Sequence, residues 1–214
     1  MSQEIISRKA GFKALPEPWP ESLLPRISSR VAKAGTKIVV LDDDPTGTQT
    51  VHGLPVLTTW DTESLVREFE TPGNAFFILT NSRALTRAEA CSLAREIGNN
   101  LAFASQKTGM TYSVISRSDS TLRGHFPHEV DEMAKTMGQE QLPYLICPFF
   151  LEGGRFTMDD VHYVAEGEDL IPAAQTPFAK DAVFGYTESN LCRWVEEKTQ
   201  GRIPADQVVS VTLD

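Results

Sequence analysis

Short apolar runs that alternate with amphipathic runs constrain the fold of this chain more than any other feature of its sequence. Thr36–Leu41 is β-branched and apolar, as is typical of a strand buried on both faces of a sheet, and Ala75–Thr80 and Thr111–Ser116 have the same character. A helical run from the capping box Thr86-Arg87-Ala88-Glu89 to about Gln106 separates the last two. Strands that alternate with helices predict an α/β fold, a three-layer sandwich with a mainly parallel sheet flanked by helices.

The same patterns predict the remaining elements. Phe156–Tyr186 is a looser stretch, and we expect it to form an irregular excursion after the fifth strand that holds a hairpin. Residues 1–35 contain several prolines and are expected to form an N-terminal arm, while residues 36–214 form an α/β domain. The further strands are predicted at Leu54–Thr59, Tyr144–Cys147 and Val208–Leu213, and the further helices at Ser22–Lys33, Asp61–Phe69, Pro127–Met137 and Glu188–Thr199.

Composition and charge narrow the classes of function. The 214 residues are 41% hydrophobic and 23% charged, as in ordinary globular proteins. The formal net charge of −9 argues against a general nucleic-acid-binding protein, because such proteins need a basic surface. No run approaches the roughly 18 apolar residues of a membrane span, and the few cysteines are scattered. We therefore expect a cytoplasmic protein that binds neither nucleic acid nor a membrane.

Polar side chains follow the predicted buried strands at the points where the strands end. Asp42, Asp43 and Asp44 come directly after the strand at Thr36–Leu41. Because the carboxyl ends of parallel strands lie along one edge of a sheet, we expect the polar residues there to converge. Arginines can clamp a carboxylate, carboxylates accept hydrogen bonds from hydroxyls, and glycines let backbone amides approach an anion. Such a pocket suits a polyhydroxylated acid or a sugar phosphate, and its further members are Arg83, Asp119, Arg123 and Arg155.

The common phosphate-binding motifs are absent from this sequence. No GxGxxG follows a predicted strand, and no GxxxxGKS/T occurs. If the protein uses ATP, its nucleotide site is therefore of another type, or lies outside this chain. The histidines and cysteines have no metal-ligand spacing, so they do not suggest a zinc site, and we assign no metal ligand in this chain.

The stretch around Asp42 fits two known families. Taken alone, the apolar strand followed by Asp42, Asp44 and Thr46 resembles the first motif of haloacid dehalogenase-like phosphatases, and Phe77–Asn81 resembles their second motif. That resemblance implies that Asp42 is a nucleophile, that Asp44 is a general acid/base and that Mg²⁺ bridges them. The lysine and the final acidic pair that such a phosphatase also needs are not evident in the sequence.

A longer part of the sequence, from about Lys37 to the end, resembles the sugar-binding N-terminal domain of the four-carbon acid sugar kinase family. The segment Ser118–Gly124, SDSTLRG, is the most specific part of this resemblance. The other matching segments are Asp43–Gly47, Ser82-Arg83, Cys147-Pro148, Gly154-Arg155, Thr176–Asp181 and Glu188–Leu191.

This second resemblance implies an ATP-dependent kinase that phosphorylates a hydroxyl of a small, four-carbon-like sugar acid. Asp44 is expected to be the catalytic residue, which orients and deprotonates that hydroxyl, and Asp43 to bind substrate hydroxyls. Arg83 and Arg123 are expected to hold the substrate carboxylate. The remaining expected substrate-binding residues are Asp119, Ser120, Gly124 and Arg155.

Members of the family carry a C-terminal nucleotide-binding domain that supplies most of the ATP site, and Mg²⁺ arrives with the nucleotide. The resemblance implies that this chain is the N-terminal half only, that it is inactive by itself, and that its partners are the nucleotide-binding domain and a small sugar acid. A homo-oligomer is also compatible with the sequence. A non-catalytic sugar-acid-binding module remains a second alternative to the kinase half.

Overall fold

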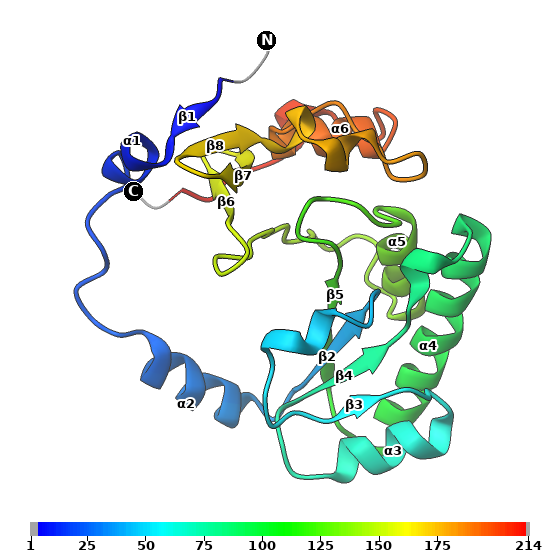
Figure 1. Ribbon diagram of the computed structural model, residues 1–214. Helices are drawn as coiled ribbons and strands as arrows, with labels where there is room; N and C mark the ends of the chain where they lie inside the picture. The colour runs from blue at the N-terminus through cyan, green and yellow to red at the C-terminus, as the bar shows by residue number, and fades with distance from the viewer. Residues whose placement is uncertain (1–3, 213–214) are drawn as a thin grey trace. The chain divides into compact units, whose positions relative to one another are not determined.

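The computed structural model describes residues 4–212, and the chain divides into two compact units (Figure 1). Unit 2 consists of Trp19–Ser118 and His128–Pro143. Unit 1 consists of Asp119–Pro127 together with the described parts of Met1–Pro18 and Tyr144–Asp214. Each unit is therefore assembled from segments that are separated in the sequence, and each has its own sheet and core.

Unit 2 is built on a parallel sheet in the strand order β3-β4-β2-β5. In the register of the sheet, Asp42 at the end of β2 lies opposite Leu79 of β4 and Arg117 of β5. The carboxyl ends of the three longer strands therefore reach the same edge, as the sequence predicts. The strands are β2 (Lys37–Asp42), β3 (Val56–Leu57), β4 (Ala75–Leu79) and β5 (Tyr112–Arg117).

Helices pack along this sheet, and the predicted α/β fold with a mainly parallel sheet flanked by helices is confirmed (Figure 1). The long helix α4 (Arg87–Thr108) packs against both α3 (Thr62–Glu70) and α5 (His128–Thr136). Its capping box is formed as predicted, because the Thr86 hydroxyl accepts from the backbone of Glu89 and the Glu89 carboxylate accepts from the backbone of Thr86. The core beneath these helices includes Val39, Leu65, Phe69, Phe76, Ile78, Ile97, Leu101 and Met133.

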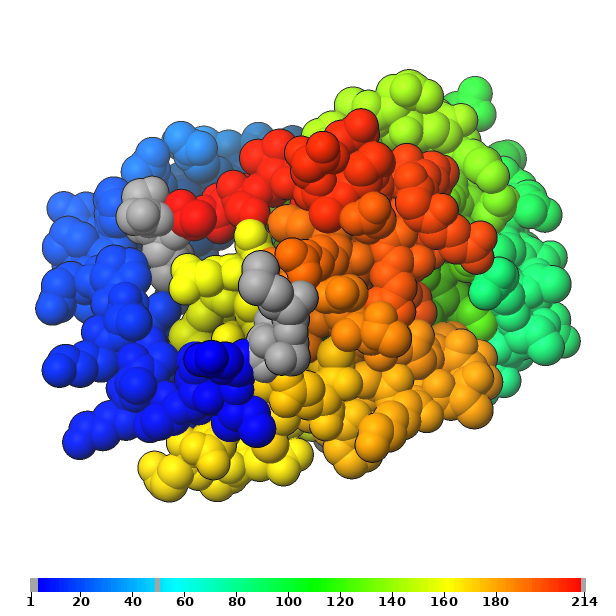
Figure 2. Space-filling view, turned by 90° about the horizontal axis from the view of Figure 1, so that it is seen from above, coloured from blue at the N-terminus to red at the C-terminus, as the bar shows by residue number. Residues whose placement is uncertain are grey.

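Unit 1 is built on an antiparallel sheet in the order β1-β8-β7-β6, so the predicted excursion is an ordered pair of hairpins. The N-terminal segment pairs with β8, and Figure 2 shows this segment in dark blue beside the yellow strands of the same unit. A second core forms around Leu122, Val164, Tyr186 and Trp194. The elements are β1 (Ile6–Ser7), α1 (Arg8–Lys13), β6 (Arg155–Met158), β7 (Val161–Glu166), β8 (Asp169–Pro172) and α6 (Leu191–Lys198).

Two of the predicted strands are wrong. Tyr144–Cys147 has no regular structure, and Leu145 is 85% exposed. Ala205–Gln207 forms a short 3₁₀ turn, and the chain from Val208 to residue 212 is irregular, while Leu213 lies outside the described residues. Both segments are short apolar runs, but neither pairs with another strand in the described structure, and an apolar run becomes a strand only where a neighbour accepts its hydrogen bonds.

Other predicted elements are confirmed with shifted ends. The helix expected at Ser22–Lys33 is α2 (Leu24–Ala34), and Gly35 ends it in the left-handed conformation that favours glycine. The helix expected at Glu188–Thr199 begins only after Asn190, whose side chain caps it. Among the described residues, no helix has both the length and the apolar character needed to cross a membrane. The division into an arm over 1–35 and a domain over 36–214 stays a prediction.

Candidate functional site

Three consecutive carboxylates occupy the end of β2, the strand that lies between β4 and β5. Asp42 and Asp43 are buried, with 0% and 5% of their surface exposed. Asp44 begins the turn into the short 3₁₀ helix Gly47–Thr50, and its Oδ1 accepts from the Thr46 backbone N–H at 2.8 Å and from the Thr46 hydroxyl at 2.5 Å. These two hydrogen bonds lower the pKa of Asp44, so its carboxylate stays ionised at neutral pH.

Arg83 joins two of these carboxylates. Its Nε and Nη2 donate to Asp43 at 3.1 Å and 2.5 Å, a bidentate pair, and its Nη1 lies 3.3 Å from Asp44 Oδ2. The Ser118 hydroxyl donates to Asp43 Oδ2 at 2.6 Å. Residues that follow β2, β4 and β5 thus meet at one edge of the sheet, as expected from the parallel strands.

Asp42 has a different environment from its two neighbours. Its Oδ1 lies 3.2 Å from Arg117 Nη1, while its Oδ2 has no hydrogen-bond partner among residues 4–212. Burial raises the pKa of Asp42. A side chain at Gly47 would overlap its carboxylate, so the glycine is required for this close approach. With no exposed surface, the Asp42 carboxylate is poorly placed to attack a phosphate, which argues against the phosphatase alternative.

A further carboxylate, that of Glu129, lies near Asp43, and the sequence does not predict this proximity. Glu129 lies in the first turn of α5, and Ser82, which begins a short 3₁₀ helix after β4, donates a hydrogen bond to it. Burial and the nearby charge of Asp43 raise the pKa of Glu129 to about 6. A glutamate in the first turn of a helix is common because its negative charge interacts favourably with the helix dipole. Its presence there therefore does not predict a contact with Ser82.

The SDSTLRG segment places a second charged group in unit 1. Arg123 Nε donates to Asp119 Oδ2 at 2.7 Å, and Arg123 Nη1 lies 3.7 Å from Asp181 Oδ2. The guanidinium carbons of Arg123 and Arg155 lie 5.2 Å and 5.5 Å from the centre of the Phe178 ring. Two cations therefore lie over one aromatic ring, and Asp119 and Asp181 pair with one of them, Arg123.

The backbone of this segment is held by side chains from the rest of unit 1. His162 Nε2 lies 2.8 Å from the Ser120 carbonyl oxygen, and the Tyr186 hydroxyl donates to the Thr121 carbonyl at 2.7 Å. Burial lowers the pKa of His162, so the imidazole is neutral at pH 7 and its Nε2–H donates to Ser120. Gly124 is buried and has a φ of +140°, a conformation that suits glycine.

The expected site residues therefore form two groups. Asp43, Asp44 and Arg83 are in contact in unit 2, whereas the other expected residues lie in unit 1. That both groups line one pocket stays a prediction. Arg155 was expected after a strand at Tyr144–Cys147 and instead begins β6, where its Nη1 donates to the Gly153 carbonyl. The unit 1 group is Asp119, Ser120, Arg123, Gly124 and Arg155.

Several contacting residues were missed although the sequence contained a signal for them. Ser118 begins the SDSTLRG segment, and Phe178 and Asp181 belong to the segment Thr176–Asp181 that carries part of the family resemblance. The resemblance named these segments, but the sequence did not show which of their side chains meet the arginines. Glu129, Arg117, His162 and Tyr186 lie outside every matching segment.

The described residues contain no cluster of side chains arranged to hold a metal ion. No group of three or more histidine, cysteine, aspartate or glutamate side chains within residues 4–212 is placed to hold a metal ion. The carboxylates at the end of β2 are engaged by Arg117, Arg83 and Thr46. ATP and its Mg²⁺ stay predictions.

The chain is similar in sequence to one family of sugar-binding domains and to two kinases that are named for acid sugars. A family model described as "sugar-binding N-terminal domain" matches residues 38–212. D-threonate kinase from Bordetella bronchiseptica is 30% identical over 114 residues, which are 53% of this chain and 26% of that protein. D-erythronate kinase from Heliobacterium modesticaldum is 29% identical over 152 residues, which are 68% of this chain and 32% of that protein. The chain thus matches no more than about a third of the length of these relatives.

A solved structure shares the fold. The crystal structure of a domain of unknown function from Bordetella bronchiseptica, a domain-swapped dimer with bound citrate, superposes with a TM-score of 0.55 at 25% identity. The match covers 74% of this chain and 39% of that one.

Proposed function

Since this chain belongs to the family of sugar-binding N-terminal domains, we propose that it binds a small acid sugar and presents one of its hydroxyl groups for phosphorylation by ATP. The observation that carries the proposal is the contact of Asp43 and Asp44 with Arg83 at the carboxyl edge of a parallel sheet. The relatives named D-threonate kinase and D-erythronate kinase favour a four-carbon sugar acid as the substrate. The citrate bound by the related structure is likewise a small hydroxy acid.

Asp44 is the proposed catalytic residue. Its ionised carboxylate can accept a hydrogen bond from the attacking hydroxyl and hold that oxygen in line with the phosphoryl group. Because the transition state of phosphoryl transfer is loose, the hydroxyl proton leaves late, and a carboxylate with a low pKa is sufficient as its acceptor. Asp43, fixed by Arg83 and Ser118, is proposed to bind a second hydroxyl.

The substrate carboxylate is proposed to bind to arginines. In unit 1, Arg123 and Arg155 both face Phe178, and Arg155 Nε is buried without a hydrogen-bond partner among the described residues. A buried donor of this kind is costly, and a ligand carboxylate oxygen would satisfy it. In unit 2, Arg83 is the proposed cation nearest to the reacting hydroxyl. Asp119, Ser120 and Gly124 complete the proposed substrate-binding set.

The phosphoryl donor is proposed to come from a second domain. When bound, ATP would supply the γ-phosphoryl group, and its Mg²⁺ would neutralise the negative charge of that group. A C-terminal nucleotide-binding domain is the proposed partner that holds it, since this chain presents no phosphate-binding loop of the common types. The isolated chain is therefore expected to bind the sugar acid without phosphorylating it. A homo-oligomer is compatible with the domain-swapped dimer of the related structure.

Thermal unfolding of the isolated chain tests the binding half of the proposal. D-Threonate or D-erythronate should raise the melting temperature, because a ligand at about 100 times its Kd stabilises the native state by about 2.7 kcal/mol. Erythritol, a four-carbon polyol without a carboxylate, should have little effect. The Arg123→Gln variant should lose the shift, while the matched control Arg95→Gln should keep it, since Arg95 pairs with Glu132. Absence of any shift with both acids would refute acid-sugar binding.

A second experiment separates a kinase half from a binding module. The chain is mixed with a C-terminal nucleotide-binding domain of the family, ATP and Mg²⁺, and the sugar acid is analysed for a phosphate ester. A kinase half gives product that depends on both proteins. If the sugar acid binds but no ester forms, the chain is a binding module. Hydrolysis of a generic phosphate ester by the isolated chain with Mg²⁺ would instead support the phosphatase alternative.

A further inference from the structure

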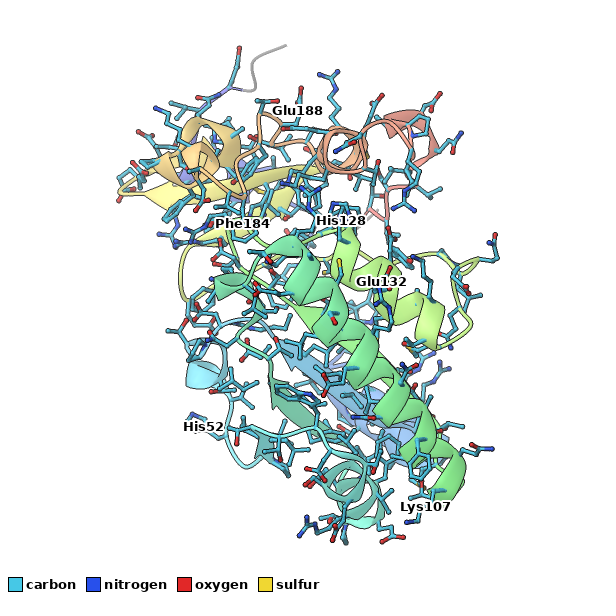
Figure 3. All side chains as sticks on the ribbon, turned by 90° about the vertical axis from the view of Figure 1, so that its right-hand side faces the viewer. His52, Lys107, His128, Glu132, Phe184 and Glu188 are labelled. Atoms are coloured by element: carbon cyan, nitrogen blue, oxygen red, sulfur yellow. The ribbon has the colours of Figure 1, made fainter. Side chains whose placement is uncertain are left out.

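The proposed kinase function leaves Glu129 without a role, although this carboxyl lies beside the residues that carry the proposal. Glu129 is on α5, and Figure 3 shows His128 and Glu132 of the same helix, which passes close to α4. Ser82, which donates a hydrogen bond to Glu129, is only 1% exposed. The next residue, Arg83, is the one that joins Asp43 to Asp44.

A chain of polar contacts links Glu129 to the end of β2. The Ser82 hydroxyl lies 3.2 Å from the Thr80 hydroxyl, which donates to the Asp42 carbonyl at 2.9 Å. The Arg83 backbone N–H donates to the Asp43 carbonyl at 3.2 Å. Asn81, just before Ser82, has a φ of +52°, a left-handed conformation that asparagine adopts more readily than most residues. These contacts connect Glu129 to the loop that carries Arg83.

We propose that Glu129 is a positioning residue of the acid-sugar site, which acts on Arg83 through Ser82 and takes up a proton when an acid sugar binds. This inference rests on the proposed function, and it adds a link between ligand binding and pH that the proposed function does not require. A ligand hydroxyl bound at Asp43 and Asp44 displaces water from this part of unit 2, and the loss of water favours the neutral carboxylic acid of Glu129.

Several titratable and charged groups surround Glu129. Asp43 faces it from the end of β2, Ser82 from the loop after β4, and Cys91 from α4. Burial and the nearby glutamates raise the pKa of the Cys91 thiol above its ordinary value, so it stays protonated at neutral pH. On its own helix, His128 precedes Glu129 and Glu132 lies one turn further on, where Arg95 and Lys135 hold it.

Isothermal titration calorimetry with the isolated chain measures proton uptake directly. D-Threonate or D-erythronate is titrated at one pH in buffers of different ionisation enthalpy, and the slope of the observed enthalpy gives the number of protons taken up. If the ligand raises the pKa of Glu129 by about one unit, uptake should peak at about half a proton near about pH 6.5 and fall almost to zero near about pH 4.5 and pH 8.5. Over the same range the affinity should increase about tenfold as the pH falls.

Two variants assign the proton. Glu129→Gln cannot ionise but can still bond to Ser82, so it should bind with an affinity independent of pH and with most of the proton uptake lost. Glu132→Gln is the matched control, the same change one turn away. Its affinity for the acid and its proton uptake should equal those of the unaltered chain. Binding with no proton uptake, or uptake that persists in Glu129→Gln and so belongs to a histidine such as His128, overturns the inference and leaves the proposed function intact. Absence of binding to either acid refutes the proposed function itself.

Discussion

Asp44 is fixed by Thr46 and Arg83, and its role can be tested by removing its charge alone. In a preparation that contains the nucleotide-binding domain, Asp44→Asn should lower kcat by about 10²-fold or more while KM for the sugar acid changes little, because the amide cannot accept the hydroxyl proton. Steady-state phosphorylation kinetics give both constants. Asp61→Asn is the control, since Asp61 caps α3 and is not part of the site. A fully active Asp44→Asn variant would remove the proposed role.

Glu129 should also affect the stability of the chain without ligand. Its pKa rises from 4.5 to about 6 on folding, so the native state binds the proton more tightly than the unfolded state does. Ionised Glu129 therefore opposes folding, by at most about 2 kcal/mol, above pH 6, and this cost disappears as the pH falls towards 4.5. Glu129→Gln should be more stable than the unaltered chain at neutral pH, and the difference should vanish in acid. Urea unfolding at several pH values measures it.

The opposite sign is expected for Glu132, which makes it a sensitive control. Hydrogen bonds from Lys135 and Arg95 lower the pKa of Glu132, so its ionised form favours folding above its unfolded pKa. Glu132→Gln should therefore lose stability at neutral pH, and this loss should disappear as the pH falls. Equal pH profiles for the Glu129 and Glu132 variants would contradict the assigned environments of both carboxyls.

Helices α4 and α5 approach closely at Gly98, and the packing of these two elements brings Glu129 to the sheet edge. A Cβ atom at Gly98 would overlap the Thr136 hydroxyl. Gly98→Ala should therefore destabilise the chain by about 1–3 kcal/mol, although alanine is the better helix former. Asn99→Ala, at an exposed position of the same helix, should be neutral or slightly stabilising. Chemical denaturation compares the two, and equal stabilities would contradict the close packing.

The elements that the sequence predicts well are those with a local physical signal. The capping box at Thr86 and the β-branched run of β2 contain their own information, and both are confirmed. Tyr144–Cys147 has the same apolar character, but a strand also needs a second strand to pair with. The local sequence does not show whether such a strand is available. The family was identified correctly from SDSTLRG, since a long exact motif carries more information than a periodic pattern.

The site could be predicted only where strand topology determines it. Asp43, Asp44 and Arg83 meet because each follows a strand of the same parallel sheet. Glu129 reaches Ser82 through helix packing, which has no signature in the sequence, and the family resemblance marks the segment of Phe178 without showing that its ring meets Arg123. The sequence therefore predicts the acids and arginines of the site better than the residues that hold them in place.

At the scale of the whole molecule, the chain passes between the two units several times, and this makes one segment dependent on distant residues. In a fragment of residues 19–143, the segment Asp119–Pro127 would lack Phe178, Asp181 and Tyr186. Trypsin should therefore cut after Arg123 much faster in the fragment than in the full chain, as mass spectrometry can show. Arg117, at the end of β5, should be protected in both. Equal protection of Arg123 would mean that this segment is ordered without unit 1.

The boundary between the units falls inside SDSTLRG, because Ser118 bonds to Asp43 in one unit while Asp119 holds Arg123 in the other. This has a consequence for anyone who builds chimeras to alter ligand preference. Replacing unit 1 with that of a homologue requires four junctions in the chain. The junction after Ser118 would divide the SDSTLRG segment, whose first residue belongs to unit 2 and whose other residues belong to unit 1. Hybrids made by crossovers at these four junctions should fold. A crossover one or two codons away would take Ser118 or Asp119 from a different parent than its contact residue, Asp43 or Arg123.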